Sequence, residues 1–242
     1  MKINLNFGDL CEAFEMCNMS HHFFIDLEKN EIIDINEEIE NNAEEKLESI
    51  NEEKFLIIPE RTSNEDYLVM ELFVYEIAEK DFQLSDKFYD VIHKSKPFKR
   101  FKEILDEYPE LKDKWFKFRE KQIQNDVINW LFENKIILEN QKLIPDIEIK
   151  VLDNDEIEKF PTELKDFGPM ACMNCRNEGL ILSRFFSTNC DIENMMIDEE
   201  IKRIMKEKYN TKNYGVSSTG KETILTYARC PKCGSEDIFW DF

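Results

Sequence analysis

Apolar side chains recur at helical spacing through most of residues 1–138. In the segment 9–17, Leu10, Phe14 and Cys17 lie on one face of a predicted amphipathic helix. Only one of the six glycines, Gly8, precedes residue 168, so the sequence offers few positions for tight turns there. The first two thirds of the chain are therefore predicted to be mainly helical.

The starts of further helices are indicated by their capping residues. Ser63-x-x-Asp66 is typical of a capping box, and an apolar stripe from Tyr67 to Ile77 follows it. Another short helix is expected after Ser85. Pro97 and Pro109 each suit a first helical turn, so each is predicted to open a helix, the second being the longest in the chain. Residues 136–138 are expected to end this helical block.

The same region contains a predicted β-hairpin over residues 22–35. Its turn lies at Glu28-Lys29-Asn30, where Asn30 can adopt a positive φ angle. Residues 37–53 are strongly acidic and are expected to form a solvated helix or a partly mobile segment. Residues 55–59 are predicted to be a short buried strand that ends at Pro59.

The chain changes character after residue 138. Residues 139–170 contain prolines and a possible strand at 147–151, and are interpreted as a linker or a peripheral strand segment. Residues 171–242 contain two Cys-x-x-Cys pairs, strand-like runs at 180–186 and 223–227, and a single predicted helix at 198–208. We therefore predict an α+β protein: a mainly helical N-terminal domain (1–138) with a small β-hairpin, then a C-terminal zinc ribbon with a helical insertion.

The two Cys-x-x-Cys pairs predict a metal site of four thiolates. Zinc in structural sites prefers four such ligands in a tetrahedron, and the pairs are Cys172 with Cys175 and Cys230 with Cys233. The 54 residues between the pairs exceed the usual spacing of about 15–20, so the ribbon must carry an insertion. We expect one structural Zn²⁺ here, contributing roughly 10 kcal/mol to folding.

Other interpretations of the cysteines are possible. The four could be free core residues or a redox dithiol, although no βαβ pattern surrounds either pair. Cys190 lies inside the insertion and could replace a ligand, whereas Cys11 and Cys17 are expected to be small core residues. A catalytic zinc is not expected, because four thiolates leave no position open for water.

Charge is distributed unevenly along the chain. The net charge is -20, yet residues 1–60 hold 16 Asp/Glu against 4 Lys, while residues 94–121 hold 10 Lys/Arg against 6 Asp/Glu. The acidic end favours a basic partner protein. The basic stretch, in which Phe98, Phe101 and Leu105 are expected to face the core, indicates nucleic acid as an alternative partner. The candidate contacts for nucleic acid are Lys96, Lys99, Arg100, Lys102, Arg176 and Lys232.

No run of about 18 apolar residues is present, and the first residues lack the apolar segment of an export signal. Seven cysteines without an export signal favour a reducing compartment. We therefore expect a cytoplasmic protein that does not associate with membranes.

Three patterns resemble catalytic or binding motifs. Residues 215–221 nearly match a phosphate-binding loop, but Glu222 stands where that motif requires Ser or Thr, so a hairpin turn is the better interpretation. His21 and His22 could bind a metal or act as a base, and Asp26 could serve a carboxylate-dependent hydrolase or nuclease. None of these forms a complete catalytic set, and we expect no enzymatic activity.

The order of several short elements in residues 7–136 resembles the bacterial group known as uncharacterised protein family 0158. The most specific of them are Phe98-Lys99-Arg100-Phe101-Lys102 and Trp115-Phe116-Lys117-Phe118-Arg119. The remaining elements are Ala13-Phe14-Glu15, Phe23 to Leu27, Ile58-Pro59, Tyr67 to Phe73, and Trp130-Leu131. The family usually has glycine where this chain has Asn30, and a glycine-rich approach to Phe98 where this chain has residues 94–97. The resemblance implies no catalytic residues, and it does not include the two Cys-x-x-Cys pairs.

The leading functional hypothesis is a non-enzymatic adaptor or inhibitor. Its acidic N-terminal region would bind a basic protein, and the zinc ribbon would stabilise or extend the docking surface. A nucleic-acid-associated regulator is the main alternative, and a carboxylate-dependent hydrolase or nuclease comes third.

Overall fold

The computed structural model describes residues 1–51, 53–78, 80–139, 141–160, 170–178, 181–218 and 222–240. The chain divides into two compact units, Met1–Gln141 and Lys142–Phe242. Among the residues that the structure describes, no helix combines the length and the apolar character needed to cross a membrane. The mixture of helices and small sheets is consistent with the predicted α+β class.

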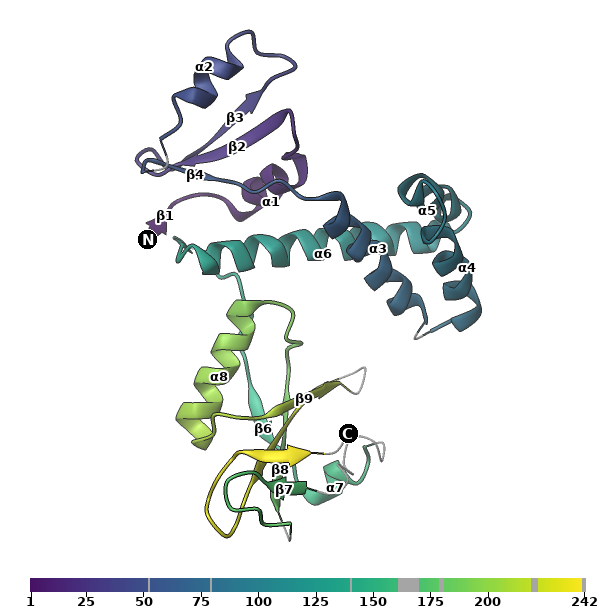
Figure 1. Ribbon diagram of the computed structural model, residues 1–242, viewed down its shortest axis with the longest axis vertical. Helices are drawn as coiled ribbons and strands as arrows, with labels where there is room; N and C mark the ends of the chain where they lie inside the picture. Colours follow the sequence, from purple (N-terminus) through teal and green to yellow (C-terminus); the bar gives the residue numbers. More distant parts are fainter. Residues whose placement is uncertain are drawn as a thin grey trace. The chain divides into compact units, whose positions relative to one another are not determined.

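Unit 1 is organised along one long helix, α6 (Pro109–Glu133), which at 1.5 Å per residue is about 37 Å long. Figure 1 shows a small sheet and the helices α1 and α2 towards one end of α6, and α3 to α5 towards the other. The helices are α1 (Phe7–Met16), α2 (Ala43–Glu48), α3 (Ser63–Ala78), α4 (Phe82–Ile92) and α5 (Pro97–Asp106). Strands β1 (Lys2–Ile3) and β5 (Ile137–Leu138) pair in parallel, which joins the two ends of unit 1.

The small sheet of unit 1 confirms the predicted hairpin. Strands β2 (His21–Asp26) and β3 (Glu31–Asn36) are antiparallel, and Asn30 has φ 57° in the turn between them. The Asp26 carboxylate accepts hydrogen bonds from the backbone N–H groups of Glu28 and Lys29, both at 2.9 Å, so this side chain closes the turn. The third strand, β4 (Phe55–Ile57), pairs with β2.

Four expectations for unit 1 need correction. Helix α4 begins at Phe82, where the Asp81 carboxylate caps it, and not after Ser85. Strand β4 is not buried, because it lies at the sheet edge and Ile57 is 51% exposed. The capping box of α3 lies one residue earlier than predicted: Thr62 Oγ1 accepts from the Glu65 N–H, and the Glu65 carboxylate accepts from the Thr62 N–H. Phe98 does not face the core, since it lies in the first turn of α5 and is 45% exposed.

The core between α3, α4, α5 and α6 is rich in aromatic side chains. Phe88 of α4 is fully buried and lies 5.7 Å from the Phe101 ring, edge to face. Phe73 of α3 and Trp115 of α6 have ring centroids 5.3 Å apart in the same arrangement. Because edge-to-face packing needs each ring at one orientation, this core fixes the four helices relative to one another.

Unit 2 contains a four-stranded antiparallel sheet with the order β6-β8-β10-β9. The strands are β6 (Ile149–Val151), β8 (Leu182–Thr188), β10 (Thr223–Arg229) and β9 (Gly215–Ser218). The expected linker or peripheral strand segment thus contains β6, which pairs with β8, and the short helix α7 (Asn154–Ile157). The predicted helix of the insertion is α8 (Met195–Tyr209), and its Ile201 and Met205 pack against Phe186 and Leu225 of the sheet.

A second, two-stranded sheet in unit 2 consists of β7 (Met170–Cys172) and β11 (Ile238–Trp240). The segment that resembled a phosphate-binding loop begins in β9, which pairs with β10 instead of leading into a helix. Its residues 219–221 lie outside the described part of the chain.

The aromatic core of unit 1 can be tested with two neighbouring residues of α4. We expect Phe88→Ala to lower the free energy of unfolding by about 3–5 kcal/mol, because it leaves a cavity among the rings. Tyr89→Ala is the matched control, since Tyr89 is 47% exposed, and should cost less than about 1 kcal/mol. Chemical denaturation of the two variants measures both values, and equal costs would contradict this packing.

Candidate metal centre

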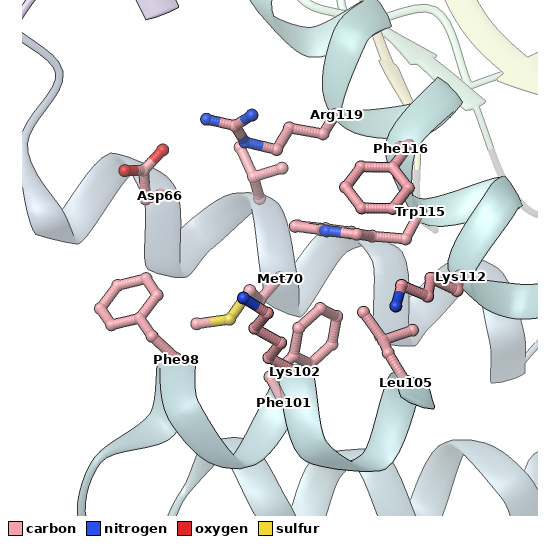
Figure 2. A pocket seen from close by; sticks show the side chains of 11 residues that line it. Asp66, Met70, Phe98, Phe101, Lys102, Leu105, Lys112, Trp115, Phe116 and Arg119 are labelled. Carbon is pink, nitrogen blue, oxygen red and sulfur yellow. The ribbon is translucent and has the colours of Figure 1, made fainter. Parts of the chain in front are cut away.

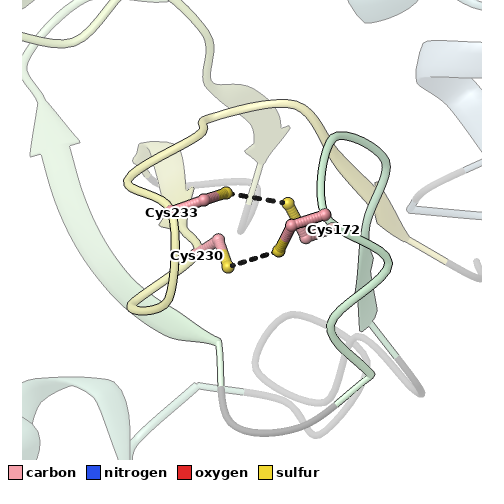
Figure 3. Close-up of side chains that lie close together, drawn as sticks. Cys172, Cys230 and Cys233 are labelled. Atoms are coloured by element: carbon pink, nitrogen blue, oxygen red, sulfur yellow. Dashed lines mark hydrogen bonds between the residues drawn. The ribbon is translucent and has the colours of Figure 1, made fainter.

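The four cysteines of the two Cys-x-x-Cys pairs converge in unit 2 (Figure 3). Cys172 is the last residue of β7, and its pair forms the turn that follows this strand. Cys230 directly follows β10, and the segment from Cys230 to Cys233 forms a turn before β11. Pairing of Cys172 with Ile238 in the β7–β11 ladder therefore brings together two turns that are 54 residues apart in the sequence.

The two turns have the same backbone geometry. In the first, the Cys172 N–H donates to Asn177 O (2.9 Å) and the Arg176 N–H donates to Cys172 O (2.8 Å). In the second, the Cys230 N–H donates to Ser235 O and the Gly234 N–H donates to Cys230 O, both at 2.9 Å. The residue after each second cysteine has a positive φ, 55° at Arg176 and 74° at Gly234. Arginine thus occupies the position that glycine favours.

The spacing of the sulfur atoms fits a tetrahedral ion. The Sγ atoms of Cys172 and Cys233 are 3.6 Å apart, as are those of Cys175 and Cys230, and all four lie within 4.8 Å of one another. Four sulfurs at about 2.3 Å from a zinc ion would be about 3.8 Å apart along each tetrahedral edge. A disulfide would need about 2.05 Å, and all seven cysteines are free. The four cysteines can therefore hold a metal ion.

Backbone N–H groups stabilise the negative charge on the first sulfur of each turn. The N–H of Cys175 lowers the pKa of Cys172 despite burial. Burial acts to raise the pKa of Cys230, but the N–H groups of Cys233 and Lys232 outweigh it and lower this pKa to about 6. Burial raises the pKa of the Cys175 thiol to about 12. A metal ion bound by the cluster would favour the thiolate form of its ligands.

Comparison with known proteins concerns mainly unit 1. The sequence model of a family described as "Uncharacterised protein family (UPF0158)" matches residues 2–154. The chain belongs to this family. A UPF0158 protein of Pseudomonas aeruginosa is 24% identical over 134 residues, which is 55% of this chain and 85% of the relative. No solved structure matches the chain.

The family match is longer than the resemblance expected over residues 7–136, and it still ends before the first metal-site cysteine. The candidate metal centre is therefore a feature of this chain outside the UPF0158 region. Among the described residues, no other group of three or more His, Cys, Asp or Glu side chains is arranged to hold a metal.

The remaining cysteines lie outside this cluster. Cys190 is buried against α8 and the sheet, in a core with Ile197 and Phe186, and its Sγ lies 3.3 Å from Asn189 Oδ1. Cys17 is buried in unit 1, and Cys11 is half-buried there. Burial raises the pKa of all three thiols, to about 11 for Cys11. These side chains behave as small apolar residues.

The histidines and Asp26 of the UPF0158 region have local structural partners. His21 Nε2 contacts the Asp34 carboxylate, and His22 Nε2 lies 2.7 Å from Glu37 Oε1 across the hairpin. Asp26 is 4% exposed, and N–H donation from Lys29 lowers the pKa of its carboxyl group. The Asp26 carboxylate thus stabilises the hairpin turn, and this structural role is sufficient to explain why it is buried.

The basic residues proposed from the sequence are mostly exposed. Lys96 has φ 59° at the residue before α5, Lys99 lies 3.7 Å from Glu103, and Arg100 Nε donates to Ser95 O at 2.9 Å. Lys102 lines a pocket between helices of unit 1. The other two, Arg176 and Lys232, belong to the cysteine turns of unit 2.

The sequence analysis did not predict two features of the site. Asn174 lies inside the first turn, and its side-chain N–H approaches Cys233 Sγ at 3.8 Å from the other turn. Arg176 supplies the positive-φ position, and its place directly after Cys175 matches that of Gly234 after Cys233. Aligning the two Cys-x-x-Cys turns with each other could have identified the second feature, whereas the first depends on how the turns face one another.

The positive-φ positions predict opposite effects of two substitutions. Arg176→Gly should raise the free energy of unfolding of unit 2 by about 0.5–1 kcal/mol, because glycine adopts this conformation without strain. Gly234→Ala should lower it by about 1–2 kcal/mol. An added Cβ there would also lie 3.2 Å from Arg229 Nη2. Chemical denaturation of metal-loaded protein measures both, and destabilisation by Arg176→Gly would contradict the equivalence of the turns.

Proposed function

We propose that the chain is a zinc-stabilised protein-interaction protein, whose UPF0158 unit binds a basic segment of a partner protein as an adaptor or inhibitor. The observation that carries this proposal is an acidic segment at residues 37–48 that the protein itself leaves largely unneutralised. The cysteine turns form a zinc ribbon with an insertion, which stabilises unit 2 without taking part in catalysis.

Zinc is favoured for the metal centre by the ligand set. Four thiolates in a tetrahedron suit Zn²⁺ or iron, while oxygen-preferring ions such as Mg²⁺ and Ca²⁺ are disfavoured. Four thiolates around a dication carry a net charge of -2. The backbone N–H groups of the two turns offset part of this charge.

The metal assignment predicts the composition and the stability of the protein. The purified full chain should contain one zinc ion, and Cys172→Ser and Cys230→Ser should each remove it, because three thiolates hold zinc less tightly. Elemental analysis of protein dialysed against a mild chelator measures this, together with the loss of unit 2 structure in thermal unfolding.

Cys190→Ala is the matched control, since this buried cysteine of the same unit lies outside the cluster. It should leave the zinc content unchanged. Iron in place of zinc would contradict the metal assignment, and full zinc retention by Cys172→Ser would contradict the ligand set.

The acidic segment is held in place by the fold. It contains six Glu and one Lys. Glu40 pairs with Lys46, and Glu38 Oε1 accepts from Ser20 Oγ at 3.1 Å. Ala43 at the start of α2 is buried against the sheet, in a cluster with Phe24 and Ile35. The segment is therefore an ordered surface.

Three carboxylates of α2 carry the charge that a partner would meet. Glu44, Glu45 and Glu48 are exposed and have no ion-pair partner among the described residues. Like charges within one short helix repel one another, and a basic segment placed against them would relieve this repulsion. Ile39, in the same segment, is 77% exposed and provides an apolar contact at its edge.

The acidic segment can be tested by removing its charge without changing its shape. The triple variant Glu44→Gln, Glu45→Gln, Glu48→Gln should weaken binding of the captured partner about tenfold, from three exposed pairs of about 0.5 kcal/mol each. Affinity capture with the full chain as bait, followed by titration of the purified partner, measures the loss.

The control is the triple variant Glu199→Gln, Glu200→Gln, Glu207→Gln, which removes the same charge from α8. These side chains pair with Lys202 and Arg203, so the control tests net charge alone. Equal binding by the two triple variants would contradict a docking role for α2.

A nucleic-acid-associated regulator is the second candidate. It is supported by the exposure of Lys96, Lys99 and Arg100 beside the 45% exposed ring of Phe98, because an exposed aromatic ring among cations suits base stacking. RNA recovered in the same capture experiment, with an affinity that falls steeply with salt, would favour this candidate over the acidic segment.

A further inference from the structure

Unit 1 contains a pocket between α3, α5 and α6 that neither the metal centre nor the acidic segment uses. Its volume is about 350 Å³. This lies at the lower end of the range of about 300–1,000 Å³ found for small-molecule sites. Figure 2 shows the aromatic side chains of α5 and α6 around it. The pocket therefore has the size for one small organic molecule.

The walls of the pocket are mainly apolar and aromatic. Trp115 of α6 packs edge to face on Phe101 with ring centroids 4.8 Å apart, which fixes the indole as a rigid wall. Phe98 and Phe116, from different helices, flank the opening and are 45% and 56% exposed. Two large aromatic rings left this exposed beside a cavity indicate an apolar occupant.

The charged residues around the pocket are mostly neutralised by neighbours outside it. Lys112 pairs with Asp106 at 2.6 Å, and Arg119 pairs with Glu15. Asp66, the acidic side chain of the lining, lies 3.2 Å from Arg61. These three side chains consequently add little net charge to the interior.

Lys102 is the exception. Among the described residues its ammonium group forms no ion pair, and the Asp106 carboxylate on which its charge acts is already paired with Lys112. The indole N–H of Trp115 likewise donates no hydrogen bond within the described part of the chain. The lining thus offers two donors without a hydrogen-bond partner there, whereas its acidic side chain, Asp66, is already held by Arg61.

We propose that this pocket binds a small amphipathic carboxylate, with its aromatic or medium-length aliphatic body between Trp115 and Phe116 and its carboxylate at Lys102. The apolar walls match the body, and the single unpaired ammonium group matches one negative charge. A cationic ligand would be repelled by the Lys102 ammonium group, and a multiply charged phosphate would find in the described lining only this one cation without an ion pair.

The class of ligand can be tested with probes that share a chain and differ in headgroup. Octanoate, octanol and octylamine would be titrated against the full chain preloaded with the fluorescent probe anilinonaphthalene sulfonate, which combines apolar rings with one anionic group. Octanoate should displace the probe at about tenfold lower concentration than octanol, because its carboxylate gains a charge-assisted hydrogen bond. Octylamine should displace it least.

Two pairs of variants assign the binding to this pocket. Lys102→Gln should abolish the preference for octanoate over octanol, whereas Lys99→Gln on the same helix, outside the lining, should preserve it. Phe116→Ala should weaken octanoate and octanol alike by about tenfold through lost apolar contact. Its control is Phe82→Ala, since Phe82 is 75% exposed and outside the lining.

Three outcomes would overturn the proposal. They are equal displacement by octylamine and octanoate, an unchanged octanoate preference in Lys102→Gln, and unchanged probe binding in Phe116→Ala. Circular dichroism of each variant verifies that the helices are retained, and the exposure of all four substituted side chains makes this the expected result. The zinc content and the partner capture are separate measurements, so this proposal stands or fails independently of the proposed function.

Discussion

The organisation of unit 2 depends on bringing four sulfur atoms into one small volume. Strands β7 and β11 have three residues each, and their ladder alone is too short to hold two turns 54 residues apart in the sequence. A metal ion held by Cys172, Cys175, Cys230 and Cys233 would join the turns with four bonds, each stronger than a hydrogen bond. Strands β8, β9 and β10 and helix α8 lie between the two turns in the sequence, and together with β6 they form an apolar core of their own. The unusual spacing of the cysteine pairs is thus compatible with a compact unit.

In unit 1 the corresponding constraint is the length of α6. Its first half contributes Trp115 and Phe118 to the aromatic core of the helical end, and Trp130 in its second half packs edge to face on Phe14 of α1. Helix α6 therefore connects the end of unit 1 that contains the small sheet with the end that contains the pocket. The acidic segment offers exposed carboxylates for a basic protein, whereas the pocket offers donors and apolar walls. These surfaces differ in charge and depth, which is why we propose a different kind of ligand for each.

Much of this architecture could be predicted from local sequence signals. Asn30 in the hairpin turn, the prolines that open α5 and α6, and the four cysteines each act within a few residues of their own position. Other features depend on tertiary packing. The capping box was predicted at Ser63 but lies at Thr62. Both residues have a hydroxyl group and a carboxylate three residues later, so only the fold selects between them. Phe98 has helical spacing with Phe101, yet the first turn of α5 extends past the packed core. The pocket arises where α3 packs against α5 and α6, which follow it in the sequence only after α4, so no local pattern encodes it.

The proposed organisation of unit 2 requires that four thiolates hold one zinc ion. X-ray absorption spectroscopy at the zinc edge of the purified full chain measures the number and type of ligands directly. We predict four sulfur neighbours at about 2.3 Å and no nitrogen or oxygen neighbour. A first shell that contains nitrogen or oxygen, or fewer than four sulfurs, would contradict it.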